Sequence, residues 1–274
     1  MAYIFKYHDS QLYSHHSLDS APDAEQFAMH AHEWLEILYF ISGKGSYLVE
    51  GSQYPLEPHD VFILRPAEMH NLHIDPSEPY ERIVIHFAPD ILADFDPEHS
   101  LLRPFYDRPL GQQNRYSLKS DPDGLLRSAF SSFKFDHVPD IRTNLLGRLL
   151  LLLTALNGLH GKGQMHLPAP GIQSQLVAYV NEHLFEDISV QTIADAFYRS
   201  KSHISRIFQQ ATGSSLWDYV VIKRLMAARA MIQRGEPAHD ACTACGFSDY
   251  SAFYRAYRKQ YGTSPREDSP GKGL

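Results

Sequence analysis

Cysteine, signal-like segments and long apolar stretches are all scarce in this chain of 274 residues. Cysteine occurs only twice, which is too few for a disulfide scaffold. No apolar stretch approaches the roughly 20 residues that a membrane-spanning helix needs. The first residues, MAYIFKYHDSQLY, lack the charged-then-apolar layout of a secretion signal. We therefore expect a cytoplasmic protein with no membrane partner.

The two cysteines, Cys242 and Cys245, stand in the short motif CTAC. A zinc site would need two further ligands nearby, and none is evident. We interpret both as small buried helix residues. A pH or redox sensor, suggested by the 16 histidines and by this motif, is a weaker hypothesis because a histidine count carries little information.

Positive charge is scarce in the front part of the chain. Residues 1–170 hold 13 Lys and Arg against 22 Asp and Glu, a formal charge of −9, whereas residues 171–274 hold 12 against 10, a formal charge of +2. This distribution argues against a general cationic coat. It leaves the last hundred residues able to present a local basic face, which phosphate binding requires.

Short β-type segments dominate residues 27–87. They are rich in β-branched and aromatic residues, and the turn signals SGKG, EGSQ, EPHD and DPSEP separate them. Many short strands at close intervals predict a small barrel or sandwich. The clearest predicted strands are Leu35–Ile41, Gly45–Glu50, Val61–Leu64 and Arg82–Phe87.

The periodicity becomes helical from about residue 125, with predicted helices at Leu125–Phe135 and Ile141–Leu159. The second contains RLLLLLTALNGL, which is apolar on nearly all sides. We expect it to form a dimer contact, with a purely intramolecular core as the alternative. The Gly- and Pro-rich segment 161–171 reads as a linker. We predict an α+β protein of two domains, residues 1–160 and an all-α domain at residues 172–266.

Residues 188–213, ISVQTIADAFYRSKSHISRIFQQATG, predict a helix-turn-helix unit. A short helix begins near Val190, and a turn through Tyr198 and Arg199 follows it. Ser200 is a suitable N-cap for the second helix, and Gly213 is a suitable stop. The second helix has one apolar stripe and one polar face.

Residues 238–262 repeat this plan. Gly246 lies in the turn, and Ser248 or Asp249 can cap the second helix. Phe253, Ala256 and Tyr257 form its predicted buried stripe, with Gly262 at its end. Between the units, Leu216–Gln233 predicts one long helix. Such a helix would hold the two second helices rigidly, so that they could enter successive major-groove turns roughly 34 Å apart.

The sequence here resembles the AraC/XylS family of bacterial regulators. The matching stretches are IADAFYRSKSHISRIFQQATG, DYVVIKRLMAARAMI and GFSDYSAFYRAYRKQYGTSP. The resemblance implies a transcription regulator that binds double-stranded DNA, usually as an activator, and that contacts RNA polymerase. It implies base contacts from Ser202, Ser205, Arg206, Tyr250, Ser251, Tyr254 and Arg255, and backbone contacts from Lys201, Gln209 and Arg258. Arg206 or Arg255 could instead bind only phosphate or an acidic neighbour.

A second resemblance lies in FAMHAHEWLEILYFISG, whose H-x-H-x3-E-x6-G spacing resembles the first motif of the cupin barrel. In an extended strand His30, His32, Trp34 and Glu36 share one face. Metal-binding cupins would use His30, His32, Glu36 and His70 as ligands. Three interpretations stay open for these four residues: a polar pocket for an effector such as a sugar, which we favour, a divalent metal site, or structural histidines. No resident cofactor is expected.

Two functions follow from these patterns. The first is an effector-responsive DNA-binding regulator, a homodimer without enzymatic activity. The alternative is a metal-dependent cupin enzyme fused to a DNA-binding domain. No nucleophile motif or phosphate-binding glycine loop supports another chemistry.

Overall fold

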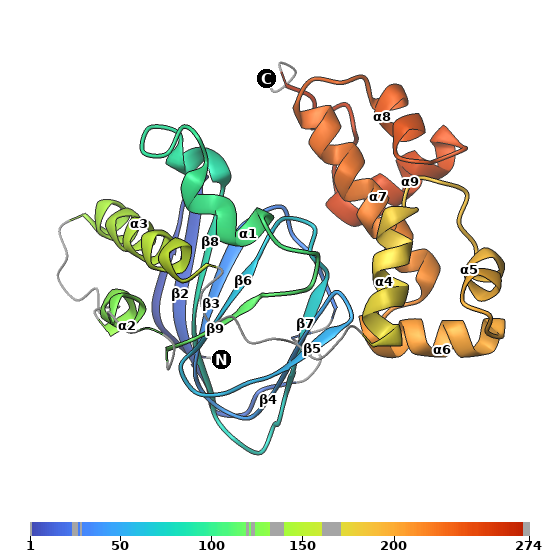
Figure 1. Ribbon diagram of the computed structural model, residues 1–274. Coiled ribbons are helices and arrows are strands. Elements are labelled where there is room, and N and C mark those ends of the chain that lie inside the picture. The colour runs from blue at the N-terminus through green and yellow to red at the C-terminus, as the bar shows by residue number, and fades with distance from the viewer. Residues whose placement is uncertain are drawn as a thin grey trace. The chain divides into compact units, whose positions relative to one another are not determined.

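The computed structural model describes residues 2–23, 27, 29–118, 121, 124–131, 140–160 and 171–270. The chain divides into two compact units, Met1–Ala169 and Pro170–Leu274 (Figure 1). Of the predicted linker, only Gly171 falls within the described residues, and the predicted helix that starts at residue 125 is described only to residue 131.

The first unit is built from strands. Among the described residues they form a six-stranded sheet in the order β1-β2-β8-β3-β6-β9 and a three-stranded sheet in the order β5-β4-β7. All pairings are antiparallel. The strands are β1 (Ala2–His8), β2 (Leu12–Asp19), β3 (Leu35–Ser42), β4 (Gly45–Val49), β5 (Ser52–Pro55), β6 (Asp60–Leu64), β7 (His70–Ile74), β8 (Tyr80–Phe87) and β9 (Arg115–Ser117). The four strands predicted from the sequence are confirmed to within two residues.

Side chains alternate between the two faces of the six-stranded sheet, and each face has its own core. Leu38, Phe40 and Val84 point toward the three-stranded sheet, where they pack with Tyr47 and Leu72. The residues between them point the other way and form a second core with the helices. The position of a residue in β3 or β8 therefore decides which core it faces.

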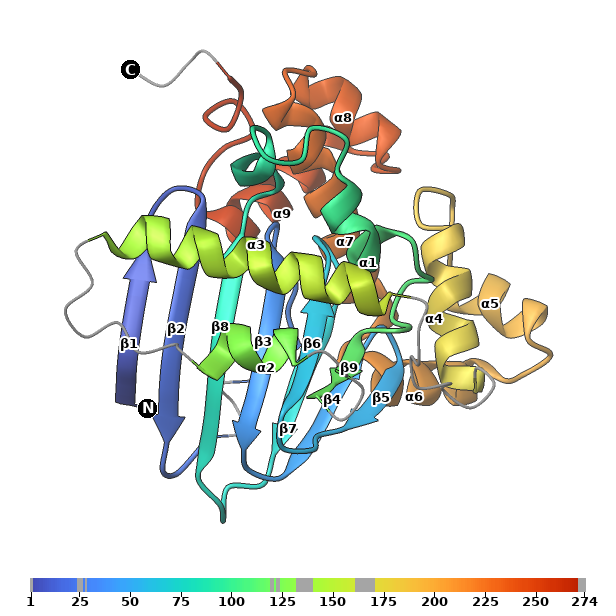
Figure 2. The same ribbon diagram turned by 60° about the vertical axis from the view of Figure 1, so that its left-hand side comes forward.

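Helices cover this second face. The short elements are η2 (Pro89–Leu92), η3 (Ser100–Leu102) and α1 (Arg103–Tyr106), and the longer ones are α2 (Leu125–Ser131) and α3 (Ile141–Leu159). Figure 2 shows α3 lying across the strands of the six-stranded sheet. Its buried leucines, such as Leu149 and Leu152, pack into the core of this unit. The opposite side of α3 exposes Thr143, Gly147 and Leu151, so the helix is not buried all round.

The second unit is helical throughout its described elements. These are α4 (Ile172–Glu182), α5 (Val190–Ala196), α6 (Lys201–Thr212), α7 (Leu216–Gln233), α8 (Ala238–Ala244) and α9 (Tyr250–Tyr261). The predicted long helix Leu216–Gln233 is confirmed as α7, residue for residue. No helix among the described residues is long and apolar enough to cross a membrane.

Two cores lie along α7. Near its start, Tyr219 packs edge-on against Phe208 of α6, with ring centroids 5.2 Å apart, and accepts a hydrogen bond of 2.7 Å from Asn181. Near its end, Leu225, Ala228 and Ile232 pack against α8 and α9. One helix therefore carries part of the core of each helix-turn-helix unit.

Candidate functional site

Helix α6 presents a polar face to solvent in the first helix-turn-helix unit. Ser200 is its N-cap and accepts a hydrogen bond from the His203 amide, and Gly213 ends it in the left-handed region, both as predicted. Ile204, Ile207, Phe208 and Ala211 are buried. All five residues predicted here as DNA contacts are exposed: Lys201, Ser202, Ser205, Arg206 and Gln209.

Helix α9 repeats this arrangement in the second unit. Asp249 is the N-cap and accepts hydrogen bonds from the amides of Ser251 (2.9 Å) and Ala252 (3.2 Å). Phe253 and Tyr257 are fully buried, as predicted. Of the residues predicted to contact DNA, Tyr250, Ser251, Arg255 and Arg258 are exposed, whereas Tyr254 is half-buried.

The two arginines predicted to contact bases differ in their surroundings. Arg206 lies 3.2 Å from Nδ1 of His203, one turn earlier in the same helix. Within the described part of the chain, neither Arg206 nor Arg255 forms an ion pair with an acidic side chain. Both guanidinium groups are therefore available to an anionic or guanine-bearing partner.

A buried arginine of α7 ties the segment between α4 and α5 to the turn of the second helix-turn-helix unit. Arg224 donates hydrogen bonds to the backbone carbonyls of Leu184 (2.7 Å), Glu186 (2.6 Å) and Gly246 (2.6 Å). Gly246 lies in the turn of the second unit at φ 78°, and a Cβ there would lie 2.7 Å from the carbonyl oxygen of Phe185. Glycine is thus required at this turn for its conformation and for the close approach of the chain.

An acidic residue beyond the second unit, which the sequence analysis did not identify, also fixes α9. Asp268 accepts hydrogen bonds from Arg229 of α7 (2.8 Å) and from the Tyr257 hydroxyl (2.7 Å). Burial and the neighbouring Asp268 carboxylate raise the pKa of Tyr257. The only sequence signal was an acidic residue shortly after the GTSP stretch.

The two cysteines are buried and unlinked, as expected. Cys242 and Cys245 pack in the core of the second helix-turn-helix unit, beside Met231. Burial raises the pKa of Cys245 to about 11, which keeps the thiol protonated and unreactive near neutral pH.

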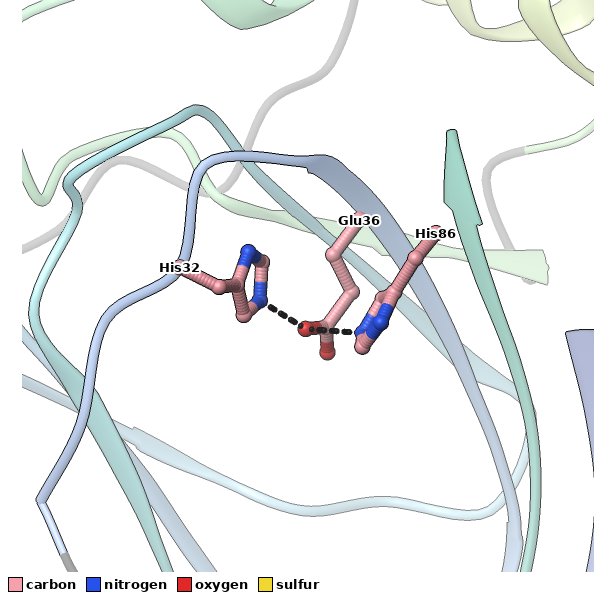
Figure 3. A group of neighbouring side chains, drawn as sticks. All are labelled: His32, Glu36 and His86. Atoms are coloured by element: carbon pink, nitrogen blue, oxygen red, sulfur yellow. Dashed lines mark hydrogen bonds and ion pairs between the residues drawn. The ribbon is translucent and has the colours of Figure 1, made fainter. Parts of the chain in front are cut away.

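In the strand-rich unit, residues 1–169, a buried carboxylate lies among histidines between the two sheets. Glu36 faces the inner core because it shares a strand face with Leu38 and Phe40. Its Oε2 lies 2.7 Å from Nε2 of His32 and 2.9 Å from Nε2 of His86, and Figure 3 shows the carboxylate between these two rings. Nε2 of His70, on the opposite sheet, lies 3.8 Å away.

The predicted ligand set is thus only partly brought together. His32, Glu36 and His70 converge, but the compact group of possible ligand atoms consists of His32, Glu36 and His86. His30 is exposed and contacts the edge of the His70 ring, with centroids 4.3 Å apart. His86 was missed by the sequence analysis because it lies 50 residues after Glu36, and the β3–β8 register places the two side by side.

The prediction of one extended strand through His30 and Glu36 was wrong in its first half. The chain bends at Glu33 and Trp34, and β3 begins only at Leu35. The bend lets Nδ1 of His32 donate to the Trp34 carbonyl at 3.0 Å, which turns its Nε2 toward Glu36. Local backbone geometry, rather than strand alternation, therefore brings His32 to the site.

The electrostatics of the cluster follow from burial and proximity. Burial alone would raise the pKa of Glu36, but His86, His32 and His70 outweigh it and hold that pKa well below its usual range. Burial lowers the pKa of His70 to about 3, so this imidazole is neutral.

A row of polar side chains continues from this cluster along the inner face of β2. His15 pairs with Val84 and Ser17 with Arg82, so both point to the same side as His86. His15 is 7% exposed and Ser17 is fully buried. Neither ring nitrogen of His15 nor the Ser17 hydroxyl has a hydrogen-bond partner among the described residues. Buried polar atoms of this kind are normally satisfied by water or a ligand.

Two family models match the chain. The AraC-like ligand binding domain matches residues 19–130, and a helix-turn-helix domain matches residues 193–268. The HTH-type transcriptional activator RhaS of Citrobacter koseri is 24% identical over 252 residues, which is 90% of this chain and 88% of that protein.

Higher identity is found over shorter stretches. The RhaS activator of Enterobacter sp. is 33% identical over 100 residues, and the probable transcriptional regulator LumQ of Photobacterium leiognathi is 34% identical over 88 residues. Each of these two matches spans 36% of the relative's own length.

Among solved structures, ToxT from Vibrio cholerae is 11% identical, with 96% of this chain and all of that chain covered and a TM-score of 0.40. The DNA-binding domain of AdpA in complex with a target DNA is 28% identical over 35% of this chain and 88% of that chain, with a TM-score of 0.33. The family models and the relatives agree with the two units and with the paired helix-turn-helix elements. The chain belongs to the AraC/XylS family of DNA-binding transcription regulators, and it carries an AraC-like ligand-binding domain before its helix-turn-helix domain.

Proposed function

We propose that this regulator is a cytoplasmic activator that reads DNA through α6 and α9 and binds a small polar effector between the sheets of its first unit. The observation that carries the DNA-reading part is the pair of capped helices on α7, each with a buried apolar stripe and an exposed polar face. The family relatives named as activators support the sign of regulation.

Base readout in this proposal comes from the exposed turns of the two helices. Arg206 and Arg255 are the residues suited to bidentate pairing with guanine, since guanidinium matches the O6 and N7 acceptors. Serine and tyrosine hydroxyls, at Ser202, Ser205, Tyr250, Ser251 and Tyr254, are more permissive partners. Lys201, Gln209 and Arg258 would bind phosphate and fix the register on the duplex.

Effector binding is supported by the unpartnered buried polar atoms on the inner face of the first unit. Hydroxyl groups of a carbohydrate could satisfy both ring nitrogens of His15, the Ser17 hydroxyl and Nε2 of His70, which have no hydrogen-bond partner among the described residues. Of the four predicted effector contacts, His32, Glu36 and His70 lie in this cluster and His30 lies at its edge. Coupling to DNA binding requires that the effector prefer one arrangement of the protein.

Dimer formation through α3 is part of the proposal. The exposed side of α3 carries Thr143, Gly147, Leu151 and Thr154, and a Cβ at Gly147 would meet no atom within 4 Å. Thr143, Gly147 and Thr154 are small enough for a second helix to approach closely, and Leu151 offers it an exposed apolar side chain. An activator must also contact RNA polymerase, and we place no residue in that contact.

A metal-dependent enzyme fused to a DNA reader is a second candidate, favoured by the grouping of His32, Glu36 and His86. The two functions differ in whether the purified chain converts a small substrate. Turnover of a small substrate by the metal-loaded chain would favour the enzyme, and effector-dependent DNA binding without turnover would favour the regulator.

The test selects binding sites from random duplexes with the full-length chain, with and without a panel of monosaccharides. On the selected site, Arg206→Ala and Arg255→Ala should each cost about 1–3 kcal/mol and relax base preference at one position. Arg234→Ala is the control, because Arg234 is an exposed arginine at the end of α7, outside both helices. If no duplex is enriched over competitor DNA at moderate salt, the proposal fails.

A further inference from the structure

A histidine of α6 contacts one of the two arginines that we place in base readout. Nη2 of Arg206 lies 3.2 Å from Nδ1 of His203, one helical turn earlier. Side chains three residues apart are neighbours on a helix surface, so the spacing itself allows the contact. Within the part of the chain that the structure describes, Arg206 makes this single side-chain hydrogen bond. The guanidinium is exposed, whereas His203 is half-buried.

The helix cap fixes the backbone that carries His203. Its amide donates to the hydroxyl of Ser200 at 3.3 Å, and the following residue, Ile204, is buried. An exposed arginine, by contrast, has several rotatable bonds, and ordering it on binding costs conformational entropy. A contact with a shorter side chain on a fixed backbone lowers that cost, because it orders the guanidinium before DNA arrives.

The chemistry of the two groups decides which of them donates. A guanidinium keeps its charge in proteins and has donors only, so Nδ1 of His203 is the acceptor. The ring in this contact is therefore neutral and carries its proton on Nε2. The contact uses one N–H of Arg206 and leaves the other donors of the guanidinium for the O6 and N7 acceptors of guanine.

The second helix-turn-helix unit has no counterpart of this contact. Helices α6 and α9 each span 12 residues between an N-cap and a glycine in the left-handed region, and Arg206 and Arg255 occupy the same position in them. The residue three places earlier is His203 in α6 but Ala252 in α9. Alanine offers no acceptor, and among the described residues Arg255 forms no side-chain hydrogen bond. The two helices therefore differ in whether a neighbour orients the arginine.

We propose that His203 is a positioning residue for base readout, whose neutral ring holds the guanidinium of Arg206 in the orientation that pairs with guanine. The inference rests on the proposed function, because it requires that α6 read DNA. It makes base discrimination by Arg206 depend on a hydrogen-bond acceptor at residue 203.

The experiment uses the full-length chain and the duplex selected from random DNA. It adds the three single-pair substitutions at the position where Arg206→Ala relaxes the preference. Dissociation constants are measured by fluorescence anisotropy at one salt concentration, and discrimination is the ratio of two such constants. His203→Ala should reduce discrimination at this position about three- to tenfold, the effect of one lost hydrogen bond. The preference at other positions should not change.

Two variants at the same residue separate an acceptor from a packing role. Asparagine places Oδ1 where histidine has Nδ1, so His203→Asn should keep most of the discrimination. His203→Phe keeps an aromatic ring without an acceptor, so it should behave as His203→Ala does. Gln210→Ala is the control, since Gln210 is an exposed residue in the last turn of α6, outside the proposed contacts. It should bind as the unchanged chain does.

A double variant shows whether His203 acts through the arginine. In the Arg206→Ala background, His203→Ala should cause no further loss of discrimination, because the effect passes through the guanidinium. A ratio of constants from one preparation does not change when part of the protein is unfolded, so a less stable variant still gives an answer. Additive losses, or discrimination that survives in His203→Phe but not in His203→Asn, would overturn the inference.

The same measurements keep this inference apart from the proposed function. If no duplex is enriched, or if Arg206→Ala leaves the base preference intact, DNA reading by α6 is wrong. If Arg206→Ala relaxes the preference while every His203 variant discriminates as the unchanged chain does, only the role of His203 is wrong.

Discussion

The turn of the first helix-turn-helix unit holds Tyr198 at φ 52°, whereas the turn of the second holds Gly246 at φ 78°. Tyr198 is 90% exposed, so its side chain tolerates the unusual backbone by projecting into solvent. Gly246 lies against the Phe185 carbonyl and the guanidinium of Arg224, where a side chain does not fit. The turn at Tyr198 is therefore open to solvent, whereas the turn at Gly246 is closely packed.

The two helix-turn-helix units also differ in how they pack against α7. The first relies on large apolar side chains, such as Phe208 of α6 against Tyr219. The second also buries large side chains, Phe253 and Tyr257, but it adds directional hydrogen bonds from Arg224 and to Asp268. Directional contacts between buried groups are lost all at once when one partner is removed. The second unit should therefore be the more sensitive of the two to single substitutions.

The largest effect is expected from Arg224→Ala. It leaves three carbonyls without their donor, and buried groups without partners cost about 1–3 kcal/mol each, so we expect a loss of about 3–5 kcal/mol. Hydrogen exchange of the amides in residues 238–262 should accelerate more than exchange in α6. Arg234→Ala should leave both units unchanged. Equal acceleration in the two units would contradict the comparison.

Gly246→Ala should cost about 2–3 kcal/mol, because the left-handed backbone and the 2.7 Å approach of the Phe185 oxygen both oppose a side chain. Gly262→Ala is the matched variant: it has φ 75° but nothing within 4 Å of the added carbon. It should cost roughly 1 kcal/mol. The difference, measured by urea unfolding of the full chain, isolates the close approach. Equal costs would show that backbone conformation alone requires the glycine.

Asp268→Asn should cost about 1–2 kcal/mol, since the amide keeps one oxygen for Arg229 and Tyr257 but loses the negative charge that pairs with Arg229. We expect a weaker affinity for the selected DNA, with base preference lost on the side read by α9. Asp240→Asn changes an exposed carboxylate of α8 and serves as the control. If the footprints of both variants are unchanged, Asp268 is not needed to hold α9 in place.

The smallest effects are expected at the helix caps. Asp249 accepts from two amides and Ser200 from one, so Asp249→Ala should destabilise more than Ser200→Ala, with both near 1 kcal/mol. Thermal unfolding of the two variants under one condition compares them. If Ser200→Ala is the more destabilising, the first unit depends on its cap more than the structure indicates.

The helical part of this fold was accessible from the sequence because its signals are local. The N-caps Ser200 and Asp249 and the stop residues Gly213 and Gly262 lie within a few residues of the helices they delimit. The bounds of α7 followed from its apolar periodicity and its flanking turns. The role of Asp268 could not be predicted, because nothing near it in the chain indicates that it contacts Arg229.

Only half of the site between the two sheets could be predicted from the sequence. His32 and Glu36 are neighbours in sequence, but His86 reaches Glu36 through the register of two strands, which no local pattern specifies. One signal was present: His86 interrupts the apolar stretch IVIHF, and a polar residue in a strand of that kind is worth testing as a site residue. The bend at Trp34 could not be foreseen from alternation alone.

Because α7 contributes Tyr219 to one core and Ile232 to the other, α6 and α9 would act, under the proposed function, as a single bivalent ligand for DNA. Once one of them has docked, the second meets its half-site at a high local concentration, without a separate search through solution. A change that weakens either half-site would then shorten the residence time on the whole operator, and altering the number of base pairs between the half-sites would abolish the gain from joining them.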